Sequence, residues 1–423
     1  MKHNLIISAL LTITVAVAAQ EPNVLFIGNS YTEVNNLPQM VYNVAQSMGE
    51  SITYASNTPG GCTFQQHCTN RSMDLIRQGG WDIVVLQEQS QYPSFPQSQV
   101  EAEVFPYAER LIDSVYAHNP CAEPMFYMTW GRKNGDQLNA QYFPILGTYE
   151  GMDSMLCERY TYMAETYDAS LCPVGRVWRY IRTYYPDIEL YQSDDSHPSL
   201  AGTYAASCAF YTMIFHNDPN NISYAPDINA ETARAIRLAT HTVVYEQLTQ
   251  WTRPMPAVSI DTLRTENNTV WFTYECLNAD SLTWHFGDGT DTIMSSGENH
   301  TIQHTYADSG QYTATVVARR HCLTDTRMMQ IHTFGDSNHI GTSDLPIFGG
   351  EICIYPNPTS CNAAITTPTP AQATLTYIDG RTIWHSETTP GETVIPLQQL
   401  PAGTYLLTIV TQNTTTTHKV IKK

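Results

Sequence analysis

The chain has 423 residues, which is enough for about two or three domains that each bury a hydrophobic core. It carries 21 Lys and Arg against 40 Asp and Glu, so its net charge is −19. An acidic chain repels phosphate backbones, so we expect no nucleic acid partner and favour neutral over anionic substrates.

The amino terminus, MKHNLIISALLTITVAVAAQ, has the layout of a secretory signal peptide over residues 1–18. Lys2 precedes an apolar centre, and small residues follow at 16–18. A retained membrane anchor is the alternative, but the apolar part is short for a bilayer and no other run is long enough. We therefore expect export, with the mature protein secreted or attached to the cell surface at the outer membrane, and no transmembrane segment.

Residues 19–252 alternate short apolar runs with longer helical patterns, which predicts a domain with a parallel sheet covered by helices on both faces. Helices on both faces of one sheet would make an α/β domain of three layers. The expected strands are 24–27, 51–56, 82–87, 124–130 and 171–174. Helices are expected near 37–48, 99–117, 147–168, 199–215 and 228–250.

After Pro254 the chain changes to short Thr- and Val-rich runs broken by Gly, Asp and Asn, a composition typical of β domains. One such domain is expected over 253–335. The polar, turn-rich residues 336–348 indicate a linker, and a second β domain is expected over 349–423. Two small β-sandwiches would thus follow the α/β domain.

Ten cysteines in an exported chain permit disulfides. A mixture of free buried cysteines and a few bridges is the alternative. No Cys or Cys-His spacing of the zinc-site type occurs, so no metal site is predicted. The pairs that lie within one local segment are Cys62/Cys68, Cys157/Cys172, Cys276/Cys322 and Cys353/Cys361.

A serine stands on a glycine-bearing turn directly after the first expected strand. Ser30 thus lies at the carboxyl end of a strand, where open α/β sheets build their sites. A serine hydroxyl needs an imidazole to take its proton, and the imidazole needs a carboxylate to orient it. Asp194 and His197, near one turn, supply such a pair. The G-x-S-x-G elbow is not matched, because Thr32 occupies its second glycine position.

The joint pattern resembles the SGNH (GDSL-like) esterase superfamily over about residues 22–250. GNSYT at 28–32 is similar to its first block, with Asn29 in place of the usual aspartate. Its last block, Asp-x-x-His-Pro, is matched at 194–198. The resemblance implies a three-layer α/β/α sandwich of the flavodoxin-like class and a catalytic triad of Ser30, His197 and Asp194. Asp195 is the alternative acid, although it is also placed to cap the helix after Pro198.

The resemblance also implies an oxyanion hole formed by backbone N–H groups of Ser30 and Gly61 and a side-chain amide. Gly61 lies in TPGGCTF, residues 58–64, which is similar to the family's second block. The third block usually carries an asparagine, and here glutamines stand instead. A glutamine amide can donate as asparagine does with one more methylene, and Gln89 is the expected donor over Gln87 and Gln91. WDIVVLQEQS and CPVGRVW resemble a bacterial subgroup that has glutamine in this stretch.

Three aromatic residues near expected strand ends are candidates for stacking on a sugar: Tyr31, Tyr92 and Trp130. Ordinary core packing is the alternative for each ring.

The two β blocks resemble known modules. LTWHFGDGT at 282–290 and HTYADSGQYTATVVA at 304–318 resemble a PKD domain, an immunoglobulin-like spacer or weak binding module. The resemblance implies a core tryptophan and a tight turn at 287–289. IYPNPTS at 354–360 and GTYLLTIV at 403–410 resemble the C-terminal sorting domain of type IX secretion, which implies the type IX machinery as a partner.

The prediction is a secreted SGNH-type serine esterase that hydrolyses short acyl esters, acetyl esters above all, on carbohydrate through an acyl-enzyme. The mechanism needs no cofactor. Two alternatives stay open at this point: a lipid or thioester hydrolase, and a catalytically idle surface protein that binds carbohydrate or mediates adhesion.

Overall fold

The computed structural model describes most of the chain: residues 21–295, 301–333 and, between 353 and 423, all but 356, 358, 360, 361, 368, 378–380, 390 and 412–414. The expected signal peptide and linker lie outside the described residues, as does Cys361. Contacts divide the chain into two compact units, Met1–Asp336 and Ser337–Lys423.

A five-stranded parallel sheet organises the first part of the chain, in the order β2-β1-β3-β4-β5. The strand register is in line with the expected apolar runs, since Val24 pairs with Ile83 and Ile27 with Leu86. Because the strands are parallel, the loops after β1, β2, β3 and β4 all leave the sheet at one edge. The strands are β1 Asn23–Ile27, β2 Thr53–Asn57, β3 Ile83–Leu86, β4 Glu123–Tyr127 and β5 Ser170–Cys172.

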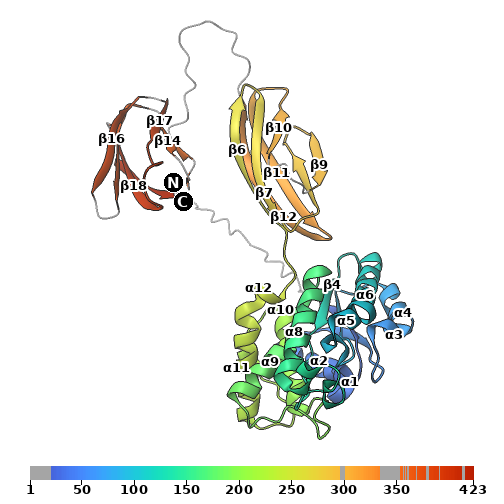
Figure 1. Ribbon diagram of the computed structural model, residues 1–423. Coiled ribbons are helices and arrows are strands. Elements are labelled where there is room, and N and C mark those ends of the chain that lie inside the picture. The colour runs from blue at the N-terminus through green and yellow to red at the C-terminus, as the bar shows by residue number, and fades with distance from the viewer. Residues whose placement is uncertain are drawn as a thin grey trace, which may run out of the picture. The chain divides into compact units, whose positions relative to one another are not determined.

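Helices cover both faces of this sheet (Figure 1), which confirms the three-layer α/β/α class. From β1 the chain moves to β2 at one edge of the sheet, and it then returns across the sheet through β3 and β4 to β5 at the other edge. Because the crossovers are right-handed, this reversal of direction places α2 on one face and α4, α6 and α8 on the other. α10 packs beside α2, and α11 packs beside α9 and α10. The helices are α1 Ser30–Glu33, α2 Leu37–Ser47, α3 Phe64–His67, α4 Arg71–Gln78, α5 Gln97–Glu103, α6 Phe105–His118, α7 Gln137–Ala140, α8 Tyr149–Thr166, α9 Val174–Tyr184, α10 Leu200–Phe215, α11 Ala230–Val243 and α12 Leu248–Trp251.

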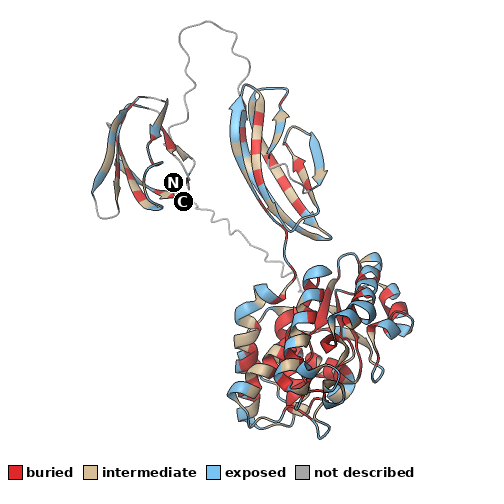
Figure 2. Cartoon of the chain, viewed as in Figure 1, coloured by how far each residue is buried: buried red, intermediate tan, exposed pale blue. Residues whose placement is uncertain are grey.

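The core of this domain lies between the sheet and its helices, where the buried residues of Figure 2 concentrate. Leu25, Phe26 and Val84 on the central strands are fully buried, as expected for strands covered on both faces. The helix expected over 99–117 is divided, since α5 ends at Glu103 and Pro106 lies in the first turn of α6.

A β-sandwich follows in the same unit, with sheets ordered β10-β7-β6 and β12-β11-β8-β9. Trp284 is fully buried in its core and Gly287 and Gly289 adopt positive φ at the expected turn. The strands are β6 Ala257–Glu266, β7 Thr269–Leu277, β8 Ser281–His285, β9 Asp291–Ser295, β10 Thr301–Thr305, β11 Gly310–Arg320 and β12 Leu323–Thr333.

A disulfide joins Cys121, just before β4, to Cys322, between β11 and β12. The local pair Cys276/Cys322 is therefore wrong, because the β11–β12 turn meets the α/β domain rather than β7. Cys62, Cys68, Cys157 and Cys172 are free thiols, so the other two local pairs within the α/β domain are wrong as well. Arg320 Nε reinforces the same junction with an ion pair to Asp168 Oδ2 at 2.8 Å.

The second unit is a smaller β structure with sheets ordered β13-β14-β17 and β16-β15-β18-β19. Its core contains Ile365, Leu375, Leu407 and Ile409, all fully buried. The strands are β13 Cys353–Tyr355, β14 Ala363–Thr367, β15 Ala371–Tyr377, β16 Thr382–Thr388, β17 Gly391–Ile395, β18 Gly403–Val410 and β19 Thr415–Lys422.

Candidate active site

The turn between β1 and α1 presents Ser30 at the carboxyl edge of the sheet. Asn29 caps α1, since its Oδ1 accepts a hydrogen bond from Tyr31 N at 3.1 Å. Gly28 is required by close packing, because a Cβ there would lie 2.5 Å from Thr32 Oγ1 and 2.7 Å from Gln87 Oε1. The tight turn leaves Ser30 half-buried as the first helical residue.

His197 and Asp194 meet this serine from a loop far along the chain. His197 Nε2 lies 2.8 Å from Ser30 Oγ, across 167 positions of sequence. His197 Nδ1 hydrogen-bonds Asp194 Oδ2 on the other side of the ring. Ser30, His197 and Asp194 thus form one hydrogen-bonded line, which is the geometry expected of a nucleophile, a base and an orienting acid.

The Asp194–His197 loop is held closed by its own backbone. Tyr191 and Pro198 form an antiparallel bridge, and Gln192 N donates to His197 O at 2.8 Å. Asp194 Oδ1 accepts from the backbone N–H of Ser196 at 3.1 Å and of His197 at 3.0 Å. Partial burial acts to raise the pKa of Asp194, but the hydrogen bonds from His197 and Ser196 outweigh it and lower the pKa below its usual value.

Asp195 points away from the histidine ring. Its Oδ2 accepts from Asn134 Nδ2 at 3.0 Å, and its Oδ1 lies 3.9 Å from Lys133 Nζ. The expectation that Asp195 caps α10 is wrong, because the cap is Ser199, whose Oγ accepts from Gly202 N at 3.1 Å. The backbone of Asp195 is left-handed, with φ 58°, which turns its side chain toward the β4 loop.

Three loops gather around the nucleophile through Asn29. Asn29 Nδ2 donates to Cys62 O at 3.1 Å and to Glu88 O at 3.3 Å. Asn29 N donates to Gln87 Oε1 at 3.0 Å. The segment after Gly61 and the segment before Gln89 are therefore tied to the serine turn. Asn29 thus joins the three loops through neutral amide contacts.

The three candidate glutamines have different environments. Gln87 is fully buried, and its Oε1 accepts hydrogen bonds from Asn29 N at 3.0 Å and from Thr32 Oγ1 at 2.9 Å. Gln91 Oε1 accepts a hydrogen bond from Arg132. Gln89 Oε1 accepts from Gln91 N at 2.9 Å, and its Nε2 donates to no group in the described part of the chain. Gln87 Nε2 donates to Glu88 O, whereas the amide N–H groups of both Gln89 and Gln91 donate to no group in the described part of the chain and are available for a ligand.

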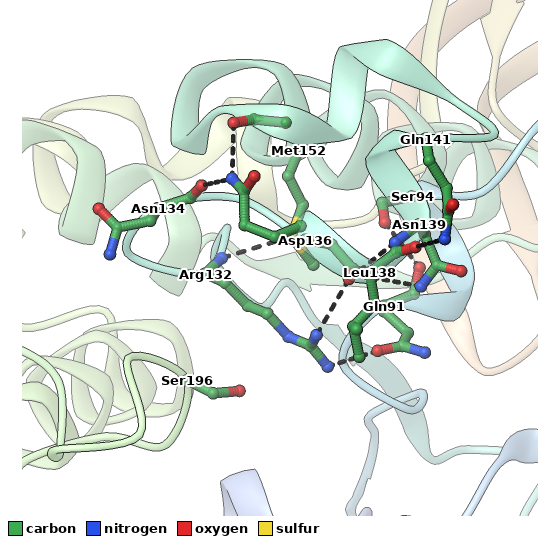
Figure 3. A network of polar contacts seen from close by, with 12 residues as sticks. Gln91, Ser94, Arg132, Asn134, Asp136, Leu138, Asn139, Gln141, Met152 and Ser196 are labelled. Carbon is green, nitrogen blue, oxygen red and sulfur yellow. Dashed lines mark hydrogen bonds and ion pairs between the residues drawn. The ribbon is translucent and has the colours of Figure 1, made fainter.

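A network of polar contacts surrounds Gln91 and Arg132, next to the candidate site (Figure 3). The Arg132 guanidinium reaches Gln91 and, at 3.3 Å, Asp136 Oδ1, whose side chain is fully buried. Arg132 N also contacts Met152 Sδ at 3.4 Å. These contacts fix the loop after β4 against the loop after β3.

The aromatic candidates lie behind the triad. Trp130 is fully buried between Tyr31 and Trp178. Its ring centroid lies 4.7 Å from that of Tyr31 and 3.7 Å from that of Trp178, and both ring pairs are nearly parallel. The expectation that Trp130 stacks on a sugar is therefore wrong, because both of its faces are covered. Tyr31 is also buried, with its OH 2.7 Å from Ser196 Oγ, so it packs against the His197 loop instead of facing a ligand. Tyr92 is half-buried, with its ring centroid 5.5 Å from that of Phe95, and it stays a candidate for stacking on a sugar.

His67 is a supporting residue that the sequence motifs did not reveal. Its Nε2 donates to Gly28 O at 2.9 Å, and its Nδ1 accepts from Ser72 Oγ at 2.8 Å. Burial lowers the pKa of His67 to about 4, so the ring is neutral at pH 7 and keeps this tautomer. The only sequence signal was a histidine shortly after the Gly-Gly loop, which has no specificity by itself.

Two family models match separate parts of the chain. Residues 251–333 match the PKD domain family, and residues 353–423 match the secretion system C-terminal sorting domain. The chain therefore carries both modules, and the sorting domain indicates type IX export to the cell surface or beyond. No helix among the described residues is long and apolar enough to cross a membrane. No curated protein matches the chain.

Several solved structures are similar to part of this chain. A DUF4886 family protein from Bacteroides uniformis is 17% identical, with 53% of this chain and 95% of that chain covered and a TM-score of 0.47. A protein described as a GDSL-like lipase from Parabacteroides merdae is 10% identical, covering 45% and 94%, with a TM-score of 0.34. A carbohydrate esterase family 3 protein from Talaromyces cellulolyticus is 12% identical, covering 46% and 96%, with a TM-score of 0.33.

Proposed function

We propose that the α/β domain is an exported serine esterase. Ser30 Oγ attacks the ester carbonyl while His197 Nε2 takes its proton, and His197 then protonates the leaving alcohol. Asp194 holds the ring with Nδ1–H toward itself and stabilises the imidazolium. Water, activated by the same histidine, hydrolyses the acyl-enzyme and regenerates Ser30.

The single observation that carries this proposal is the line from Ser30 Oγ to His197 Nε2, at 2.8 Å, and on to Asp194. A buried structural histidine would have both nitrogens bonded to groups that never react. Here the ring is 31% exposed and lies between a half-buried hydroxyl and an accessible carboxylate. That arrangement suits proton transfer at a surface site.

The negative oxygen of the tetrahedral intermediate would be bound by backbone N–H groups of Ser30 and Gly61 and by Gln89 Nε2. Gly61 has φ +68° and lies in open space, so its peptide can face a ligand without a side chain in between. The Cys62 carbonyl next to it is bonded to Asn29, which keeps this loop beside the serine turn.

We further propose short acyl esters, acetyl esters above all, carried on carbohydrate. The support is the partial exposure of His197 and Asp194, 31% and 46%, which lets an ester on a bulky carrier reach the serine. The sorting domain supports this proposal, because an exported enzyme has access to polysaccharides outside the cell.

The decisive experiment compares the full chain with its Ser30→Ala variant on 4-nitrophenyl acetate, 4-nitrophenyl palmitate and acetylated xylan. The wild type is expected to release acetate and to prefer the acetyl ester, and Ser30→Ala to lose at least about 10³-fold in kcat with its fold intact. Preference for palmitate would support a lipid hydrolase. Wild type without turnover, and without labelling of Ser30 by a fluorophosphonate, would support the binding protein.

A further inference from the structure

Glu88 is a fully buried acid that the triad does not use. It follows β3, and Phe64 N donates to its Oε1 and its Oε2, each at 3.0 Å. Gln89 N donates to the same Oε1 at 2.5 Å. Burial of an acid is unfavourable unless its oxygens are bonded, so these backbone contacts explain how the site tolerates it.

These two donors belong to the two segments that would supply the oxyanion hole. Phe64 begins α3, directly after the loop that contains Gly61. Gln89 carries the proposed side-chain donor. The Glu88 carboxyl group therefore bridges the two segments, and its backbone oxygen accepts from Asn29 of the serine turn at 3.3 Å. The Asn29 side chain also contacts both segments, but it donates to the carbonyl oxygens of Cys62 and Glu88, whereas the Glu88 carboxyl group accepts from the backbone N–H groups of Phe64 and Gln89.

We propose that Glu88 is a positioning residue whose carboxyl oxygens set the spacing between the Gly61 and Gln89 donors around the reacting carbonyl. This inference rests on the esterase proposed above. It assigns Glu88 no contact with substrate, and its effect on the rate would pass through the two loops.

The charge of Glu88 follows from its surroundings. No ion pair includes Glu88 among the described residues. The titratable groups whose pKa the Glu88 charge would raise are Tyr160 on α8, Cys62 before α3 and Cys68 after α3. Burial raises the pKa of each of these, so they are uncharged at pH 7. Burial likewise raises the pKa of Glu88 to about 8, although the Gln89 and Phe64 N–H groups oppose the shift.

Glu88 is therefore a neutral acid at pH 7, and its Oε1 accepts both hydrogen bonds as a carbonyl oxygen would. Above pH 8 it ionises next to the site where the transition state carries negative charge. A glutamine at this position keeps the accepting oxygen and cannot ionise. A leucine keeps the approximate volume and removes the acceptor.

The test measures kcat and KM for 4-nitrophenyl acetate from pH 6 to 10 on the full chain with Glu88→Gln, Glu88→Leu and Glu101→Gln. Glu101 is an exposed acid on α5 and serves as the matched control. At pH 7, Glu88→Gln is expected to keep kcat within about threefold, and Glu88→Leu to lose about 10²-fold in kcat with KM little changed, the size seen for a lost oxyanion donor. The wild type should lose activity above pH 8 and Glu88→Gln should not.

Hydrogen exchange by mass spectrometry keeps the test valid if Glu88→Leu is unstable or if the wild type hydrolyses no ester. Peptides covering 62–68 and 87–91 should exchange at least tenfold faster in Glu88→Leu than in the wild type, Glu88→Gln or Ser30→Ala. Exchange unchanged in Glu88→Leu, or an alkaline loss of activity that persists in Glu88→Gln, would overturn the inference. Loss of hydrolysis in Ser30→Ala bears only on the esterase itself.

Discussion

Replacing Asp194 by Asn tests which carboxylate serves the histidine. The asparagine Oδ1 can still accept from Ser196 N and His197 N, now at 3.1 and 3.0 Å, so the loop should stay folded. Its amide group would face His197 Nδ1 as a donor, which moves the ring proton to Nε2 and leaves no base for Ser30. The comparable change in serine proteases lowers kcat by about 10⁴-fold, or about 5 kcal/mol of transition-state stabilisation.

Asp195→Asn is the matched control, one position along the chain. This substitution removes the ion pair between Asp195 Oδ1 and Lys133 Nζ, which are 3.9 Å apart on side chains that are 46% and 36% exposed. An exposed pair of this kind contributes about 0–1 kcal/mol to stability. Asparagine tolerates the left-handed backbone of this position and keeps an oxygen for Asn134. We expect kcat to stay within about threefold of the wild type.

The assay is kcat for 4-nitrophenyl acetate at pH 8, with active sites counted by fluorophosphonate labelling and folding checked by thermal unfolding. Equal losses in both variants, or a larger loss for Asp195→Asn, would refute the assignment of Asp194. A loss in Asp194→Asn that tracks a lowered unfolding temperature would show that the aspartate acts on folding alone.

Two further predictions concern stability. The buried His67 has a pKa of about 4 in the folded chain and 6.5 in the unfolded chain, so the unfolded chain binds the proton first as the pH drops. The free energy of unfolding should therefore fall by about 3 kcal/mol between about pH 6.5 and pH 4. Urea unfolding at pH 7 and pH 4 should show a smaller loss for His67→Gln, and equal losses would contradict this account. The disulfide between Cys121 and Cys322 closes a separation of 201 residues, so replacing both by Ser should cost about 2–4 kcal/mol, seen as a lower unfolding temperature. Cys276→Ser should change nothing, and wild type insensitive to dithiothreitol would argue against the bridge.

Local patterns were sufficient for the architecture. The apolar runs and helical spacings predicted all five parallel strands. Four of them are buried and carry continuous apolar residues, as strands covered on both faces need, whereas β2 is half-buried to exposed. Asp194 and His197 could be paired from sequence because residues three apart on a turn meet whatever the rest of the chain does. The PKD and sorting modules were recognisable for a similar reason, since their turns and core aromatic residues lie in short signatures.

Other features depend on which distant surfaces meet, and no local pattern encodes that. Cys322 pairs with Cys121 because the β11–β12 turn reaches the α/β domain, although Cys276 was the nearer partner in sequence. Trp130 at a strand end looked accessible, yet packing between Tyr31 and Trp178 covers both faces of its ring. Side-chain direction at such positions is decided by packing across the whole domain.

The sequence by itself determined the three kinds of domain, the serine turn and the carboxylate–histidine loop, because each rests on residues close together in the chain. Only the tertiary structure decided that Ser30 and His197 lie within hydrogen-bond distance, and that Asn29 and Glu88 join the loops around them. The physical reason is that a parallel sheet brings the carboxyl ends of its strands to one edge, while the contacts made there depend on the packing of every loop at that edge.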